Sequence, residues 1–163
     1  MTSVQIESAV LTEPAVRELL AELDAHRQEQ HPEERAVPTP LDEDEVAPGR
    51  DVLLVATDEE SGVALGCGAV RVREPGVAEI TCMYVRPQAP RRHGIATALL
   101  AALEAEASAL FADRVVLASG ERQVEAVALY RRAGYAEIER FGEYADAPLS
   151  LCLGRTIAAE PSE

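Results

Sequence analysis

The sequence predicts an α/β fold, in which a mixed, mostly antiparallel sheet is flanked by helices. In the middle of the chain, three short apolar runs are separated by turn-forming residues, as in an antiparallel meander. After Pro87 the apolar period lengthens to that of a helix, and another apolar run follows at residues 114–118. A strand, a crossover helix and a further strand place the two strands parallel in one sheet.

The first fifty residues predict one strand, one helix and a long loop. Residues 4–6 predict a short strand. Thr12 is a suitable N-cap and Pro14 suits the first turn of a helix. A helix over residues 14–30 follows from apolar residues at helical spacing, namely Val16, Leu19, Leu20 and Leu23. Residues 31–49 are rich in proline and acidic side chains, so we expect a loop there.

The remaining elements follow in chain order. The expected strands are short apolar runs at residues 51–57, 64–72, 77–85, 114–118, 135–140 and 149–153. One helix runs from after Pro87 to about Leu110 on an apolar face, and another covers residues 123–133, with Gly134 placed to end it. We expect one domain over residues 1–155 and a flexible tail over residues 156–163.

Composition excludes several classes of function. The chain has 163 residues, of which 47% are apolar and 27% charged, as in a globular protein. It has no run of the roughly 18 to 20 apolar residues that a membrane helix needs, and no basic region before an apolar run at its start. We therefore expect a cytoplasmic protein without a membrane partner. A net charge of −14 repels phosphate backbones, which argues against nucleic acid as a partner.

The cysteines predict neither disulfides nor a metal site. Cys67, Cys82 and Cys152 are odd in number, lie in apolar runs and are widely spaced. Buried, reduced thiols are the expectation.

The most informative segment is residues 85–96, between a strand and the start of a long helix. The first turn of a helix has N–H groups without intrahelical acceptors and a partial positive charge, which suit a pyrophosphate. Gly94 lets the backbone approach an anion, and Arg91 and Arg92 can donate charge-assisted hydrogen bonds to phosphate oxygens. The same features also fit an ordinary loop before an arginine-rich, solvated helix start, so local chemistry leaves both interpretations open.

Residues 91–96, Arg-Arg-His-Gly-Ile-Ala, resemble the Arg/Gln-x-x-Gly-x-Gly/Ala signature of the GNAT superfamily of N-acetyltransferases. Residues 79–87 look like the fourth strand of that family, and residues 126–135 look like its second cofactor motif. The resemblance covers residues 51–153, and the N-terminal part fits in its helix-plus-loop pattern. Residues 141–150 resemble a bacterial subgroup of general GNAT proteins.

The resemblance implies a sheet whose fourth and fifth strands splay apart, with acetyl-CoA as acyl donor in the opening and no metal. It implies transfer of the acetyl group to a primary amine of a small molecule or peptide by direct attack, by a monomer or homodimer. Strand backbone would pair with the pantetheine arm, and the helix start would hold the pyrophosphate. The cofactor-binding residues implied are Met83, Tyr84, Val85, Arg91, Arg92, His93, Gly94, Ile95, Ala96, Thr97 and Gln123, the last standing where many relatives carry Asn.

Two residues are the catalytic candidates that the resemblance implies. Tyr130 matches the family tyrosine of an Ala-x-x-Leu-Tyr segment, and its hydroxyl could protonate or hydrogen-bond the departing thiolate. Without the motif it would be an aromatic residue packed on a helix. Glu79 begins the fourth strand, where several relatives place a base that takes the amine proton directly or through water. A solvated glutamate at a strand end is the equal alternative. Glu143 and Tyr144 could line the acceptor cleft or lie in a surface turn.

Three positions depart from the bacterial subgroup. Thr81 and Cys82 stand where it tends to have basic residues, and Ala118 stands where it often has a glutamate. A changed acceptor preference or a weakened activity would follow. The acidic residues 42–45 could attract a cationic amine or simply be solvated.

Two other classes of function compete with this prediction. A dinucleotide-binding domain needs G-x-G-x-x-G after the first strand of a parallel unit, whereas this turn has one glycine and follows a meander. A non-catalytic acyl-CoA-binding or protein-interaction domain with a GNAT-like fold remains the alternative.

Overall fold

The computed structural model describes residues 4–10, 13–30, 51–89, 92–120, 124–139, 141 and 150–157. In these residues, seven strands form one mixed sheet in the order β1-β2-β3-β4-β5-β7-β6. The elements are β1 (Val4–Ser8), α1 (Pro14–Gln30), β2 (Asp51–Asp58), β3 (Ala64–Glu74), β4 (Val77–Val85), α2 (Arg92–Ala109), β5 (Arg114–Gly120), α3 (Val124–Arg132), β6 (Ala136–Glu137) and β7 (Ser150–Thr156). The predicted α/β class is confirmed.

Local sequence signals predicted most of these bounds well. The predicted helix 14–30 and strand 77–85 agree with α1 and β4 at both ends. The strand expected over residues 135–140 is reduced to the two residues of β6. Tyr135 is buried in the core instead, with an exposed fraction of 3%, directly after Gly134, which has a φ of 99° in the turn that follows α3. β7 extends to Thr156, beyond the predicted end at residue 153.

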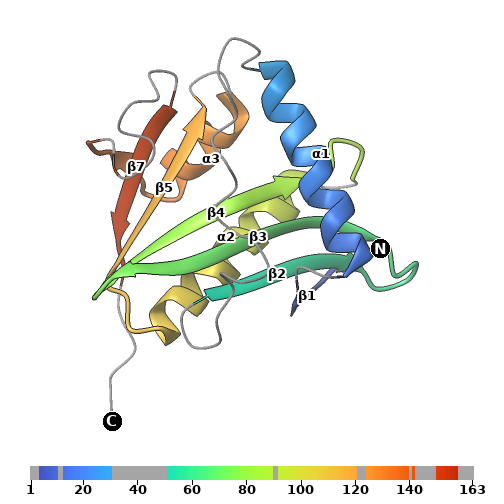
Figure 1. Cartoon of the computed structure of the whole chain (residues 1–163), viewed down its shortest axis with the longest axis horizontal. Coiled ribbons are helices and arrows are strands. Elements are labelled where there is room, and N and C mark those ends of the chain that lie inside the picture. The colour runs from blue at the N-terminus through green and yellow to red at the C-terminus, as the bar shows by residue number, and fades with distance from the viewer. Residues whose placement is uncertain are drawn as a thin grey trace.

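The sheet opens between its two parallel strands. β2, β3 and β4 form the predicted antiparallel meander. β4 and β5 pair in parallel from Val77↔Arg114 only as far as Ile80↔Leu117. From there β4 continues to Val85, whereas β5 continues to Gly120 alongside β7. The two strands visibly diverge in Figure 1, and the expected splaying is confirmed.

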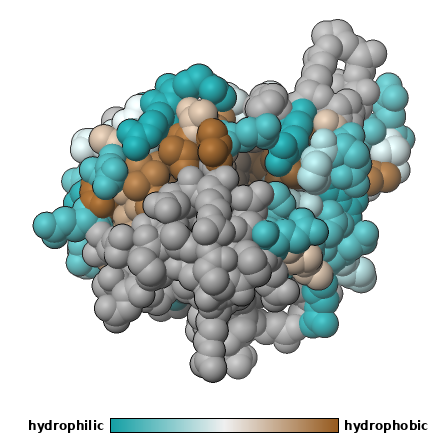
Figure 2. Space-filling view, turned by 90° about the horizontal axis from the view of Figure 1, so that it is seen from above, coloured by the Kyte–Doolittle hydropathy of each residue, from teal (hydrophilic) through white to brown (hydrophobic). Residues whose placement is uncertain are grey.

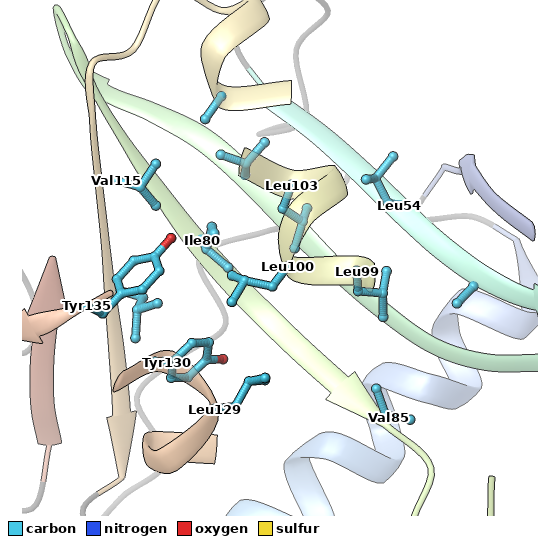
Figure 3. Close-up of a cluster of buried hydrophobic side chains, with 14 of the residues drawn as sticks. Leu54, Ile80, Val85, Leu99, Leu100, Leu103, Val115, Leu129, Tyr130 and Tyr135 are labelled. Atoms are coloured by element: carbon cyan, nitrogen blue, oxygen red, sulfur yellow. The ribbon is translucent and has the colours of Figure 1, made fainter. Parts of the chain in front are cut away.

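Helices cover both faces of the sheet. On one face, α1 buries Val16, Leu19 and Leu23. On the other, α2 buries Leu99 and Leu103 in the larger apolar cluster drawn in Figure 3. All three cysteines are buried and none forms a disulfide, as expected.

An irregularity in β4 sets which side chains face each layer. The β3–β4 register shifts between Cys67 and Ala69, and Cys82 has a φ of 56°. Residues two apart in a regular strand share a face. Here Ile80 belongs to the α2-side cluster and Cys82 to the α1-side cluster. The extra residue of a β-bulge therefore reverses the alternation just where β4 leaves β5.

Candidate active site

A cleft of about 440 Å³ occupies the opening between β4 and β5. Its walls come from β4, β5, α3, the start of α2 and the second half of α1. The residues that line it are Leu23, His26, Ile80, Thr81, Cys82, Met83, Tyr84, Val85, Pro87, Arg92, Ala96, Leu117, Ala118, Ser119, Val124, Glu125, Ala126, Leu129 and Tyr130. Seen from above, apolar side chains gather in a band that hydrophilic side chains border along its upper side (Figure 2).

The β4 wall presents a strand edge. Beyond Ile80, β4 no longer pairs with β5, while its other edge stays paired with β3 through Tyr84 and Val85. Met83, Tyr84 and Val85 all line the cleft. An extended ligand can add to such an edge through backbone hydrogen bonds.

The start of α2 forms the second wall. α2 begins at Arg92, and Arg92 and Ala96 line the cleft. The Arg92 guanidinium reaches across the opening, with Nη1 2.8 Å from Glu125 Oε2 of α3 and Nε donating to the Val85 carbonyl at 3.4 Å. The cleft therefore has a helix N-terminus and a cation at the same end.

Not every predicted cofactor residue lies against the cleft. Gly94 and Thr97 are exposed on the first turns of α2, and Ile95 is buried in the core at 4% exposure. Arg91, Gln123 and the side chain of His93 lie outside the described residues. The same holds for Glu143, Tyr144 and the acidic residues 42–45.

Tyr130 combines a packed ring with a place on the cleft wall. It is 5% exposed, and its ring meets that of Tyr135 edge to face, with centroids 6.0 Å apart. In Figure 3 its hydroxyl points away from Tyr135, toward the side of β4. The residue thus fills core volume and presents its side chain to the opening.

Glu79 lies away from the cleft lining. Its side chain is buried, and Oε1 is 2.6 Å from Nη1 of Arg73. The Arg73 guanidinium in turn lies 5.0 Å from the ring centroid of Phe141. The ion pair holds the carboxylate away from the cleft. The proton-accepting role expected for Glu79 stays a prediction.

The α1 wall holds two residues that the sequence did not predict as site residues, Leu23 and His26. A polar network fixes α1 to the end of β4. The Tyr84 hydroxyl donates to Glu22 Oε1 at 3.1 Å, and Arg86 Nη2 lies 2.9 Å from Glu22 Oε2. Burial and the hydrogen bond to Glu22 raise the pKa of Tyr84, so this hydroxyl stays protonated at neutral pH.

Two further findings concern metals and membranes. Among the described residues, no group of three or more His, Cys, Asp or Glu side chains is placed to hold a metal ion. In the same part of the chain, no helix is long and apolar enough to cross a membrane.

Comparison with known proteins assigns the family. The sequence model described as the acetyltransferase (GNAT) family matches residues 15–135. A protein of Azospirillum brasilense named IAA acetyltransferase is 34% identical over 158 residues, which cover 96% of this chain and 100% of that protein.

Solved structures of acetyltransferases resemble this chain in fold. One from Klebsiella pneumoniae, provisionally named an acyl-CoA N-acyltransferase, is 30% identical with a TM-score of 0.80 and covers 94% of this chain and 97% of its own. A GNAT family acetyltransferase from Elizabethkingia anophelis with acetyl-CoA bound shares the fold, with a TM-score of 0.64, 16% identity and coverage of 94% and 98%.

Proposed function

The chain belongs to the GNAT family of acetyltransferases, and from this premise we propose that it transfers the acetyl group of acetyl-CoA to a primary amine of a small molecule or peptide. The observation that carries the proposal is the cleft between β4 and β5. A strand edge, a helix N-terminus and Tyr130 meet there from three separate elements. The architecture of a relative that holds acetyl-CoA supports the same donor.

The two ends of acetyl-CoA fit two walls of the cleft. The pantetheine amides would pair with backbone of β4 at Met83, Tyr84 and Val85, which β5 leaves unpaired on the cleft side. The pyrophosphate would lie on the first-turn N–H groups of α2, next to Arg92. Since Arg92 is ion-paired with Glu125, the phosphates would compete with that carboxylate for the guanidinium.

The chemistry is direct attack. The amine nitrogen bonds to the thioester carbonyl carbon, the carbon–sulfur bond breaks, and sulfur leaves as a thiolate. The Tyr130 hydroxyl donates its proton to the sulfur, and the surplus proton on the new amide nitrogen restores the hydroxyl. The placement of Tyr130 on the cleft wall supports this role.

The attacking amine must first be neutral, although an amine with a pKa of about 10 is mostly protonated at pH 7. Glu79 is the candidate base from the sequence. Its carboxylate is buried, is paired with Arg73 and does not line the cleft, so Glu79 could reach the amine only through a water relay.

The identity of the acceptor is the finer part of the proposal. The Azospirillum relative is named for IAA, which supports a small-molecule acceptor and puts IAA in the first test panel. The rest of the panel is amines, amino acids, polyamines and peptides.

A coenzyme A release assay tests the function. Acetyl-CoA should raise the melting temperature, because a ligand of the native state stabilises it, and NADH should not. Thiol should appear when one class of acceptor is added to enzyme and acetyl-CoA. Binding without thiol release from any acceptor would favour the non-catalytic alternative, and absence of acetyl-CoA binding at millimolar concentration would refute the proposed cofactor site.

A further inference from the structure

We propose that His26 on α1 accepts the proton of the acceptor amine, so that the acceptor lies between α1 and the thioester. This assignment rests on the proposed N-acetyltransfer and deepens it. The placement of α1 carries it, because α1 forms a wall of the cleft that is separate from the β4 and α2 walls proposed to bind the cofactor.

The geometry directs His26 into the cleft. Leu23 and His26 lie three residues apart on α1, so they share one face of the helix, and both line the cleft. Leu23 is 3% exposed and anchors that face in the core, whereas His26 is partly exposed. In Figure 1 the second half of α1 runs past the point at which β4 and β5 have diverged.

The position of α1 is fixed rather than incidental. Glu22, one turn before His26, accepts from the Tyr84 hydroxyl and pairs with Arg86 at 2.9 Å. Arg86 is also 3.0 Å from Glu18 and donates to the Ala64 carbonyl at 3.0 Å. These contacts hold the imidazole-bearing turn against the end of β4.

The other ionisable groups around the cleft are otherwise engaged. The titratable and charged side chains that share the cleft or its α1 wall with His26 are Glu22, Cys82, Tyr84, Arg86, Arg92, Glu125 and Tyr130. Glu22 is paired with Arg86, and Glu125 is paired with Arg92. Cys82 is buried at 1% exposure. Among the described residues lining the cleft, His26 alone carries an imidazole, the side chain whose charge ordinarily changes between pH 5 and 8.

The proton balance closes without another reactant. The neutral imidazole of His26 takes one proton from the ammonium form of the acceptor and becomes imidazolium. The freed lone pair forms the carbon–nitrogen bond, and the carbon–sulfur bond breaks. A second nitrogen proton replaces the one that Tyr130 gives to sulfur, and His26 releases its proton to water.

The test compares His26→Gln with Asp24→Asn, an exposed residue of the same helix. Each is assayed from pH 5.5 to 9 with a strongly basic amine from the panel and with a weakly basic analogue that is neutral at pH 7. His26→Gln should lower kcat for the basic amine at pH 7 by about 10²- to 10⁴-fold and remove the rise of kcat with pH. The weakly basic amine should react at nearly the wild-type rate, and Kd for acetyl-CoA should not change. Asp24→Asn should follow the wild type throughout.

Three outcomes overturn the assignment. An unchanged pH profile in His26→Gln removes the residue from proton transfer. An equal loss of kcat for both amines shows that the side chain only positions the acceptor. Loss of the rise of kcat with pH in Glu79→Gln but not in His26→Gln moves the base to Glu79. Failure of the proposed function would give a different result: the wild-type enzyme would release no thiol with any amine. That result would also remove the assignment of His26 as the base.

Discussion

Substituting Tyr130 and its neighbour Tyr135 separately by phenylalanine distinguishes catalysis from packing. The two rings are in edge-to-face contact, and both side chains are almost fully buried, at 5% and 3% exposure. Their hydroxyls have different surroundings. Tyr130 lines the cleft, whereas the Tyr135 hydroxyl donates to Glu104 Oε2 at 2.8 Å. Each substitution removes one oxygen and keeps the ring, so the pair forms a matched comparison.

Tyr130→Phe is expected to lower kcat, whereas Tyr135→Phe is expected to lower the folding stability. If the Tyr130 hydroxyl only hydrogen-bonds the thiolate, its loss costs about 1.5 to 3 kcal/mol of barrier, roughly 10- to 150-fold in kcat. If it transfers a proton, the loss reaches about 10²- to 10⁴-fold. Tyr135→Phe removes one neutral donor from Glu104, which keeps Arg155 at 2.9 Å. Because the lost hydrogen bond is to a carboxylate, the cost is about 1.5 to 3 kcal/mol of folding free energy, or roughly 3 to 12 °C in Tm, with kcat unchanged.

Three measurements decide the matter: kcat, Kd for acetyl-CoA, and Tm for both variants. Tyr130→Phe should lose turnover with little change in Kd or Tm. Tyr135→Phe should lower Tm and leave kcat unchanged. Tyr130→Ala should in addition lose about 3 to 5 kcal/mol of stability, because it leaves a cavity in the core. Wild-type turnover in Tyr130→Phe, with chemistry shown to be rate-limiting, would refute the catalytic role.

Three other predictions concern the helix start and alkaline stability. Gly94→Glu puts a side chain and a negative charge on the first turn of α2, where Gly94 is exposed. It should abolish acetyl-CoA binding in calorimetry and leave Tm unchanged. Normal binding would show that the phosphates lie elsewhere. Glu125→Gln releases Arg92 from its ion pair. Because an exposed pair is worth about 0.2 to 1 kcal/mol, this change should tighten Kd for acetyl-CoA by roughly 1.4- to 5-fold at low salt, and weaker binding would contradict the prediction. Burial and the bond to Glu104 raise the pKa of Tyr135, so its stabilising effect is complete below about pH 10 and declines above it, as the unfolded chain ionises first. In urea titrations, Tyr135→Phe should remove up to about 1.4 kcal/mol per pH unit of that decline, and identical slopes in both proteins would be evidence against it.

The sequence by itself determined the elements whose signals are short-range. Helical spacing with a cap and a first-turn proline predicted α1 over its whole length, and turns on either side delimited β4. The strand–turn–helix around Arg92 and the motif containing Tyr130 are each one continuous stretch of sequence. The sequence could therefore predict both as candidate walls of the cofactor site. What these segments share is that neighbouring residues decide their conformation.

Tertiary structure alone decided which side chains face the cleft. Glu79 looks like a strand-end base in the sequence, but a contact with Arg73 from the neighbouring strand buries it in an ion pair. The bulge at Cys82 forms against β3 and reverses the alternation that the sequence would suggest. His26 stands in no motif, and it reaches the cleft because Glu22 bonds Arg86, 64 residues further along the chain. Contacts of that separation leave no periodic trace in a single sequence, because they depend on where whole elements pack rather than on their neighbours in the chain.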